Sequence, residues 1–320
     1  MCWDTRSPGL LRKSGPLAPI SPLVITWSSF SVPSCGHGEP CTQGRPALCE
    51  PGAASNGAGA LLSGSRRLQR SNGTPVHHHL GVSGFADFAV VSHRSLVKID
   101  PDLPMEEAAL FGCAVLTGMG AVVNTARMPL GASAAVIDLG GVGLSPLIGA
   151  VAPGSLEIIA IDRADDKLAF ALELGATSAV NSMDPDAEEQ IKASTGGGVE
   201  FAFDLTGVPA ALDLAFKITR RGGSTVTAGL PPPTATLPLS PLTLVAEERT
   251  LRGSYIGTSV PSRDIPHYIA LYQRGLLPVN CLMTGTLKLD DINERFDNLH
   301  SGQAIRQVLR GAPHEYHSVG

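Results

Sequence analysis

The sequence has few aromatic residues and little net charge. Phe, Trp and Tyr make up 5% of its 320 residues, 17% are charged, and the formal net charge is −5. So small a charge offers no electrostatic attraction for nucleic acid, and we expect no nucleic-acid partner. The 43% hydrophobic content is typical of a soluble globular protein. The length exceeds the roughly 250 residues at which single cores stop growing, which predicts two domains.

Long unbroken apolar runs are also missing. The longest weakly charged stretch, 133–154, contains Asp138, two prolines and five glycines, which disfavours a membrane span. No small-residue cleavage site follows the proline-broken apolar run at 16–27, so we expect no secretory signal. Six cysteines are too few for a disulfide scaffold in a chain of this size, and we expect a reducing, cytoplasmic compartment.

Glycine (36 residues) and proline (25 residues) are abundant, which favours many tight turns between strands and helices. From about 116 to 255, apolar β-branched runs alternate with amphipathic stretches, the pattern of consecutive βαβ units. The predicted strands are 134–139, 157–162, 178–181, 200–205 and 224–229. The predicted helices are 165–174, 209–218 and, near the end, 262–274.

The region before these units is less regular. Residues 1–33 have neither helical nor strand periodicity, and we expect them to be poorly ordered. A loop rich in Cys, Gly, Ser and Arg follows to about residue 73. The alternating sequence at 84–92 predicts a strand, and with it the start of a β-rich piece.

A glycine-rich turn follows the first predicted strand of the βαβ region. Gly140 and Gly143 occupy the second and third positions of a G-x-G-x-x-G pattern, and Asp138 occupies the first. In this context a diphosphate sits against free N–H groups at the helix start, so side chains at the turn must be small. Asp tolerates left-handed backbone angles, but a carboxylate there would repel a diphosphate and weaken NAD binding.

An acidic residue closes the next predicted strand. Asp162 lies 19 residues after Gly143, where a carboxylate bonds the adenosine ribose and rejects a 2′-phosphate. The order of strand, glycines, helix, strand and acid predicts NAD binding in preference to NADP. The alternative is an unrelated strand end that caps the next helix.

These residues resemble the zinc-type medium-chain dehydrogenase/reductase family, in its alcohol dehydrogenase-like branch. The matching stretches are VPSCGH at 32–37, PVHHHLG at 75–81, GCAVLTG at 112–118, LGGVGL at 139–144, IAID at 159–162, GAT at 175–177 and DINERFD at 291–297. The resemblance covers about 32–310. It implies an α/β fold: a doubly wound, parallel-sheet Rossmann domain at 115–256 and an incomplete GroES-like β-rich catalytic domain. The GroES-like domain would comprise 34–114 and a C-terminal return at 257–320.

The resemblance also implies roles for individual residues. Cys113 would be a catalytic zinc ligand, with Thr117 near the nicotinamide, Asp162 and Lys167 at the ribose, and Arg306 at the diphosphate. The implied cofactor-binding set is Gly140, Gly141, Val142, Gly143, Asp162, Lys167 and Arg306. Without the family, the apolar run around Cys113 favours a small buried hydrophobic residue over a metal ligand.

A catalytic zinc needs three protein ligands and an open position. The family supplies an early Cys and a Gly-His-Glu histidine, which the first thirty residues do not contain in register, so we expect an N-terminally truncated member. In the structural zinc loop, Cys35, Cys41 and Cys49 keep the C-x2-C-x2-C-x7-C register but Gly38 replaces the second ligand. His37 or Glu39 could substitute. The alternative is a loop with three free thiols.

Three consecutive histidines, at 77–79, also invite a metal-site interpretation. Successive strand residues point to opposite faces, so the three imidazoles cannot all meet one ion, and a structural role is favoured.

The function expected from the resemblance is NAD-dependent, zinc-assisted hydride transfer between an alcohol and an aldehyde, in a homodimer. The alternative is an impaired or inactive truncated paralogue that retains nucleotide binding or dimerisation. A zinc-free quinone reductase of the same superfamily is disfavoured by Cys113 and the three loop cysteines.

Overall fold

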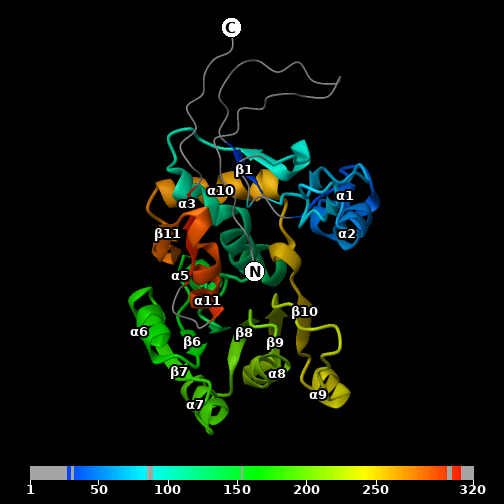
Figure 1. The fold of residues 1–320 in the computed structure, drawn as a ribbon. Coiled ribbons are helices and arrows are strands. Elements are labelled where there is room, and N and C mark those ends of the chain that lie inside the picture. The colour runs from blue at the N-terminus through cyan, green and yellow to red at the C-terminus, as the bar shows by residue number, and fades with distance from the viewer. Residues whose placement is uncertain are drawn as a thin grey trace. The chain divides into compact units, whose positions relative to one another are not determined.

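The computed structural model describes most of the chain, and its contacts divide the chain into two compact units (Figure 1). The described residues are 27–29, 32–83, 85, 89–152, 154–300 and 305–310, with the backbone alone at 27–29 and 298–300. The first unit comprises 1–112, 261–266 and 283–320, and the second comprises 113–260 and 267–282. The predicted C-terminal return, 257–320, is thus divided between the two units.

The second unit is built on a six-stranded sheet in which every pair of neighbours is parallel, in the order β10-β9-β8-β5-β6-β7. The strands are β5 (Ala134–Ile137), β6 (Ile158–Asp162), β7 (Ser178–Asn181), β8 (Val199–Asp204), β9 (Thr219–Thr227) and β10 (Thr250–Gly253). The chain runs outward from β5 through β6 to β7, then returns to β8 on the other side. The carboxyl ends of β5 and β8 therefore flank the switch point at which such sheets bind ligands.

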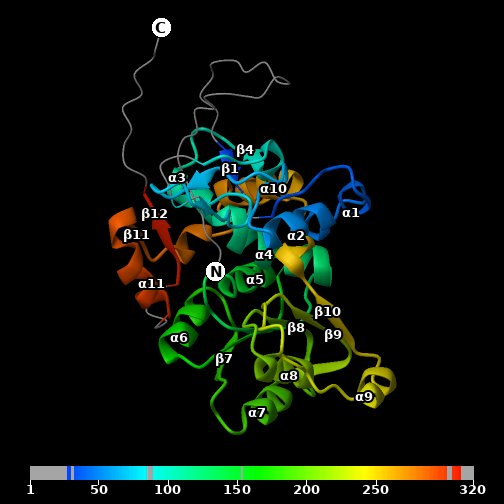
Figure 2. The same cartoon turned by 45° about the vertical axis from the view of Figure 1, so that its right-hand side comes forward.

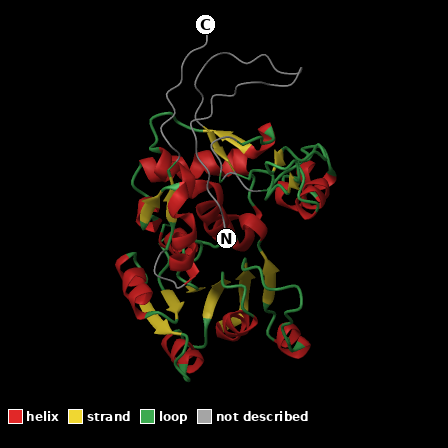
Figure 3. Cartoon of the chain, viewed as in Figure 1, coloured by secondary structure: helices red, strands yellow, loops and turns green. Residues whose placement is uncertain are grey.

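Helices alternate with these strands along the chain (Figure 3). The helices that lie wholly in this unit are α4 (Leu116–Gly120), α5 (Leu144–Val151), α6 (Asp165–Glu173), α7 (Ala187–Ser194), α8 (Pro209–Ile218) and α9 (Pro241–Ala246). Ile137 and Ile161 of the sheet form a buried cluster with Ile191 of α7 and Ile218 of α8. Burying one such side chain stabilises the fold by roughly 1.5–3 kcal/mol. Helix α5 contacts β5 and β6.

A long apolar helical run precedes the sheet. It begins with α3 (Met105–Leu110), continues through the π-helical turn Phe111–Val115 and α4, and ends with the π-helical turn Ala121–Ala126. Among the described residues, this 22-residue run alone is long and apolar enough to cross a membrane, and 89% of its most apolar window is buried in the protein. Such burial is typical of a core helix in a soluble protein. The sequence patterns did not predict this helix.

The first unit contains short strand pairs and short helices (Figure 2). Its strand pairs are β1 (Trp27–Ser29) with β4 (Leu96–Lys98), β2 (Leu68–Gln69) with β3 (Pro75–Val76), and β11 (Gly285–Leu287) with β12 (Gln307–Leu309). Its helices are α1 (Glu39–Thr42), α2 (Glu50–Gly57) and α11 (Ile292–His300), and α10 (Pro261–Gln273) begins in it. Its short 3-10 turns are Pro46–Leu48, His93–Ser95 and Leu289–Asp291, and the second unit has two more, Tyr255–Thr258 and Val279–Leu282.

The parallel-sheet α/β fold expected from the sequence is confirmed, with two local corrections. Residues 27–29, inside the segment expected to be irregular, form β1, because they pair with β4. The prediction of a strand at 84–92 is wrong for the described residues of that segment, because 85 and 89–92 are not in a strand. Alternation alone specifies no partner strand for that segment. The other residues of 84–92, and most of 1–33, lie outside the described part.

Candidate nucleotide site and cysteine cluster

The glycine-rich turn joins β5 to α5 at the carboxyl edge of the sheet. Gly140, Gly141 and Val142 form the turn, and Gly143 immediately precedes the first residue of α5. A Cβ at Gly143 would lie 1.6 Å from the carbonyl oxygen of Asp138, so no side chain fits there. The predicted turn therefore has the close backbone packing that a diphosphate-binding turn requires.

Asp138 changes the character of this turn. Its φ of 76° is in the left-handed region, which glycine adopts without strain. Its Oδ1 accepts a hydrogen bond from the Gly140 N–H at 3.1 Å. A Cβ built on Gly140 would lie 3.3 Å from Oδ1 and 3.4 Å from Oδ2. The carboxylate thus covers the face of Gly140 that must stay open for a diphosphate to approach the backbone.

Other acids near Asp138 make its charge costly. Burial, with the neighbouring Asp162 carboxylate, raises the pKa of Asp138, and Asp204 acts in the same direction. Lys167 and the Gly140 N–H oppose this shift. Its surroundings therefore disfavour the ionised form of Asp138. The negative charge of a bound diphosphate would disfavour that form further.

Asp162 ties the end of β6 to the turn. Its Oδ2 accepts the Leu139 N–H at 2.7 Å, and its Oδ1 accepts the N–H groups of Arg163 at 2.8 Å and Ala164 at 3.0 Å. The residue is 6% exposed. Lys167, in the first turn of α6, places Nζ 3.9 Å from Oδ2. The glycine turn and the acid predicted from the sequence, and the lysine implied by the resemblance, are thus brought together.

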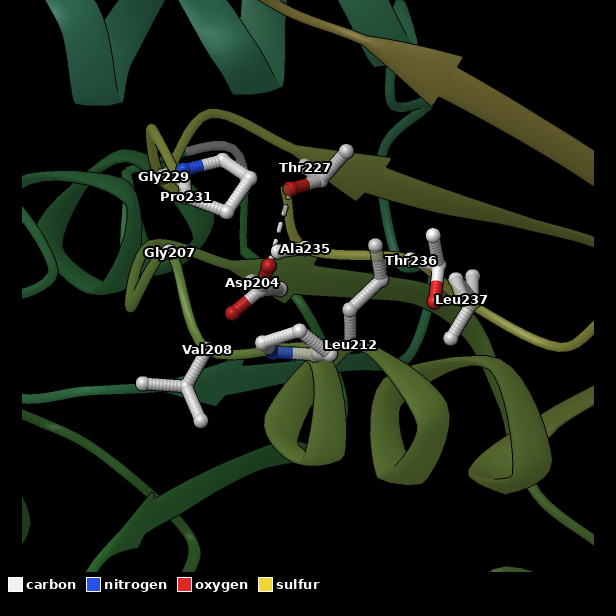
Figure 4. A pocket seen from close by; sticks show the side chains of 11 residues that line it. Asp204, Gly207, Val208, Leu212, Thr227, Gly229, Pro231, Ala235, Thr236 and Leu237 are labelled. Atoms are coloured by element: carbon white, nitrogen blue, oxygen red, sulfur yellow. Dashed lines mark hydrogen bonds between the residues drawn. The ribbon is translucent and has the colours of Figure 1, made fainter. Parts of the chain in front are cut away.

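A small pocket lies beside the end of β8 (Figure 4). It has a volume of about 80 Å³ and is lined by Asp204, Gly207, Val208, Pro209, Leu212, Thr227, Gly229, Pro231, Ala235, Thr236 and Leu237. The Asp204 carboxylate accepts hydrogen bonds from the hydroxyls of Thr206 at 2.7 Å and Thr227 at 2.8 Å. Ligand pockets usually measure roughly 300–1,000 Å³, so this space is too small to hold a dinucleotide.

Sequence reasoning missed Asp204. The signal available was the acid at the end of a predicted strand, followed by Thr206 and Gly207. Two threonine hydroxyls satisfy its buried charge, and its strand borders the switch point, so Asp204 adds negative charge beside the nucleotide turn.

Thr117 and Cys113 lie on the apolar helical run of the second unit. Thr117 is 6% exposed, and its hydroxyl has no hydrogen-bond partner among the described residues. A buried hydroxyl without a partner is costly, which suits a position that meets a ligand. Cys113 is 2% exposed, in keeping with the apolar run around it.

The predicted metal loop forms a cluster in the first unit. The sulfurs of Cys35, Cys41 and Cys49 all lie within 4.8 Å of one another, the one group of at least three potential metal ligands found among the described residues. The three are free thiols. The backbone N–H groups of His37 and Gly38 lower the pKa of Cys35 to about 6. Burial raises the pKa of Cys41. The Cys49 sulfur accepts the Cys35 N–H at 3.1 Å.

His78, His79 and Arg306 have hydrogen-bond partners within the first unit. His78 is buried, accepts the Arg67 N–H at Nε2 (3.0 Å), and contacts Ser83 Oγ through Nδ1 (3.3 Å). Burial lowers its pKa. His77 and His79 are exposed, in keeping with a structural role for the run. Arg306 is 9% exposed and its backbone pairs with Thr284.

Comparisons with known proteins agree on one group of relatives. The family model described as zinc-binding dehydrogenase matches residues 141–274. The chain is 33% identical to the S-(hydroxymethyl)glutathione dehydrogenase of Paracoccus denitrificans over 286 residues, 87% of this chain and 76% of the relative. It is 32% identical to the crystal structure of an alcohol dehydrogenase zinc-binding domain protein from Burkholderia ambifaria, with a TM-score of 0.88 over 94% of this chain and 80% of that one. For benzyl alcohol dehydrogenase from Acinetobacter calcoaceticus the identity is 30%, the TM-score 0.81, and the coverage 89% and 77%.

Proposed function

The chain belongs to the zinc-type medium-chain dehydrogenase/reductase family, in its alcohol dehydrogenase-like branch, and from this premise we propose that it binds NAD and transfers hydride between an alcohol and an aldehyde. The observation that carries this proposal is the joint position of the glycine turn, Asp162 and Lys167 at the carboxyl edge of the sheet. The cofactor supplies the redox chemistry, and the protein binds and orients it.

Asp162 would select NAD over NADP. Its carboxylate keeps acceptor capacity for ribose hydroxyls beside three backbone N–H bonds, because each oxygen has two lone pairs. A 2′-phosphate would bring negative charge against a nearly buried carboxylate. Lys167 limits that repulsion only partly, since its Nζ is 3.9 Å away and the lysine side chain is itself partly exposed.

Thr117 would act at the other end of the cofactor. Its hydroxyl is buried without a partner among the described residues and can form a hydrogen bond with the nicotinamide or the substrate oxygen. For Arg306 the role at the diphosphate stays a prediction from the family resemblance.

The family uses zinc as a Lewis acid on the alcohol oxygen. Cys113 could supply one ligand, but no group of three potential ligands among the described residues includes it. The described residues therefore do not fit a catalytic zinc, and we assign no step of hydride transfer to a metal.

The second candidate function is nucleotide binding without turnover. Two observations favour it: the Asp138 carboxylate covers Gly140, and no group of three potential metal ligands among the described residues includes Cys113. Each affects a position on which the dehydrogenase chemistry depends.

We also propose a cytoplasmic homodimer that associates through the edge of the sheet. Strand β10 is an outer strand of the parallel sheet and offers backbone groups for pairing with a second copy. The free thiols of Cys35, Cys41, Cys49 and Cys281 suit a reducing compartment. Light scattering of the purified chain would give the dimer mass, and a monomer mass at micromolar concentration would contradict this.

Calorimetric titration of the reduced protein tests the proposed function. NAD should bind more tightly than NADP, and Asp162→Asn should reduce that preference. Oxidation of a primary alcohol such as benzyl alcohol, followed as NADH formation, separates the two candidates. Turnover supports the dehydrogenase, and NAD binding without turnover supports the binding module. Failure to bind NAD even in Asp138→Gly would contradict both.

A further inference from the structure

The sulfurs of Cys35 and Cys41 lie 3.8 Å apart, and the Cys49 sulfur completes a triangle within 4.8 Å. Zinc binds thiolate sulfur at about 2.3 Å, and the edge of a tetrahedron with that radius is about 3.8 Å. The Cys35–Cys41 edge therefore matches a tetrahedral zinc site, and the two edges to Cys49 exceed that length by at most about 1 Å.

No protein side chain among the described residues supplies the fourth corner. The family register places a ligand at Gly38, whose added Cβ would lie 3.3 Å from Cys35 Sγ and meet nothing else within 4 Å. The two neighbours of Gly38 are turned to other partners: His37 Nδ1 is 2.9 Å from the Cys35 carbonyl oxygen, and Glu39 Oε1 accepts a hydrogen bond from Gln43. Both side chains are exposed.

We propose that the cysteine cluster binds zinc through three thiolates, and that the position left open at Gly38 takes an exogenous small-molecule thiol as the fourth ligand. A soft thiolate donor matches the three already present. The position is reachable, because Gly38 is half-exposed and its neighbours on both sides are at the surface.

Arg94 favours an anionic ligand at this site. Three thiolates and one divalent zinc carry a net charge of −1, and a fourth thiolate makes it −2. The Arg94 guanidinium lies directly over Gly36, where an added Cβ would be 2.1 Å from Nη1. Gly36 is next to Cys35 in the chain, and its backbone N–H bonds the Cys41 sulfur. Arg94 therefore places positive charge beside the cluster and offsets the added negative charge.

Gly38→Cys is the variant that closes the site. Gly38 has φ −68° and ψ 160°, which any residue adopts, so cysteine introduces no backbone strain. Gly38→Ser is the matched control, because it adds a similar volume with a poorer donor for a thiolate-rich site. Cys281→Ala removes the remaining described free thiol, whose Sγ bonds the Pro278 carbonyl oxygen, and excludes that thiol as a ligand.

Cobalt titration of the full-length reduced protein is the experiment. Thiolate-to-cobalt charge-transfer absorption counts the sulfur ligands, so Gly38→Cys should absorb about one third more than wild type per bound cobalt. Adding 2-mercaptoethanol should raise the wild-type absorption to the Gly38→Cys level with saturation. It should leave Gly38→Cys unchanged, and Cys281→Ala should behave as wild type. Imidazole should not produce the same rise.

Metal release gives a second readout. The open position is a point of attack for a chelator, so wild type should lose cobalt at least about tenfold faster than Gly38→Cys, because even outer-shell changes alter metal affinity 10–100-fold. Added thiol should slow the wild-type release, and Gly38→Ser should release cobalt like wild type.

Three results would overturn the proposal. The first is no cobalt binding by wild type when Gly38→Cys binds. The second is a wild-type spectrum that already has the four-sulfur intensity and ignores added thiol. The third is saturation by imidazole in place of thiol. None of these depends on NAD binding or alcohol turnover, so failure here leaves the proposed function standing.

Discussion

Replacing Asp138 by glycine is predicted to strengthen NAD binding. The carboxylate accepts the Gly140 N–H at 3.1 Å and covers the face of Gly140 that a diphosphate must approach. Glycine removes the charge, the volume and the left-handed strain at φ 76° together. The turn then exposes the Gly140 N–H to the cofactor.

The magnitude follows from the charge and its distance. Two unit charges 4 Å apart interact by about 4 kcal/mol at an effective dielectric constant of about 20. The side chain can rotate away or take up a proton when the cofactor binds, which reduces the repulsion. We therefore expect a gain of about 1.5–3 kcal/mol, or roughly 10- to 150-fold in Kd.

Calorimetric Kd values for NAD with wild type, Asp138→Gly and Asp138→Asn give the test. Asparagine keeps the size and tolerates the left-handed angles, so it removes the charge alone. Asp138→Asn should recover most of the gain. The remaining difference between Asn and Gly measures the volume over Gly140 and the backbone strain.

Equal Kd values in wild type and Asp138→Gly would refute this reasoning, provided that both proteins bind NAD. The carboxylate would then have left the turn on binding at negligible cost. A tighter Asp138→Gly together with an unchanged Asp138→Asn would refute the electrostatic part and leave the steric part.

Five further outcomes are expected. Burial and Asp162 raise the pKa of Asp138, so the wild-type Kd for NAD should fall as pH falls towards that raised pKa, whereas Asp138→Asn should show a flat profile. The raised pKa also means that the folded state binds the Asp138 proton more tightly than the unfolded state does. The free energy of unfolding should therefore decline as pH rises from the ordinary pKa of Asp through the raised pKa of Asp138. Chemical denaturation of Asp138→Asn should lack that decline. Asp162→Asn should lower the free energy of unfolding by about 1–3 kcal/mol, because a carboxylate that accepts three backbone N–H groups is replaced, and thermal unfolding measures it. Gly143→Ala should cost about 2–4 kcal/mol, since its Cβ would meet the Asp138 carbonyl oxygen at 1.6 Å. Gly253→Ala is the control, because its Cβ would meet nothing within 4 Å, and similar melting temperatures would contradict the close-packing argument. Thr117→Val should weaken NAD binding by about 0.5–1.5 kcal/mol without loss of stability, and an unchanged Kd would remove Thr117 from the site.

The sequence by itself determined the elements of the second unit. Helix α8 has the predicted bounds, and β7 does too, because a period of 3.6 and buried β-branched runs leave little choice locally. It also determined the order of glycine turn, strand and acid, from which the position of Asp162 beside the turn follows. Parallel strands place all their carboxyl ends at one edge of the sheet.

Tertiary structure decided what the local pattern could not specify. The partner of β1 is β4, nearly seventy residues away, and no alternation in either segment names the other. Whether the Asp138 side chain points over Gly140 or away from it depends on how β6 and β8 bring Asp162 and Asp204 close to it. Likewise the sequence spacing of Cys35, Cys41 and Cys49 indicates the register of a metal loop. The 3.8 Å between the sulfurs of Cys35 and Cys41, and the hydrogen bonds that turn His37 and Glu39 to other partners, come from the folded loop. Periodicity encodes which face a residue occupies, but contacts between distant segments are set by packing in three dimensions.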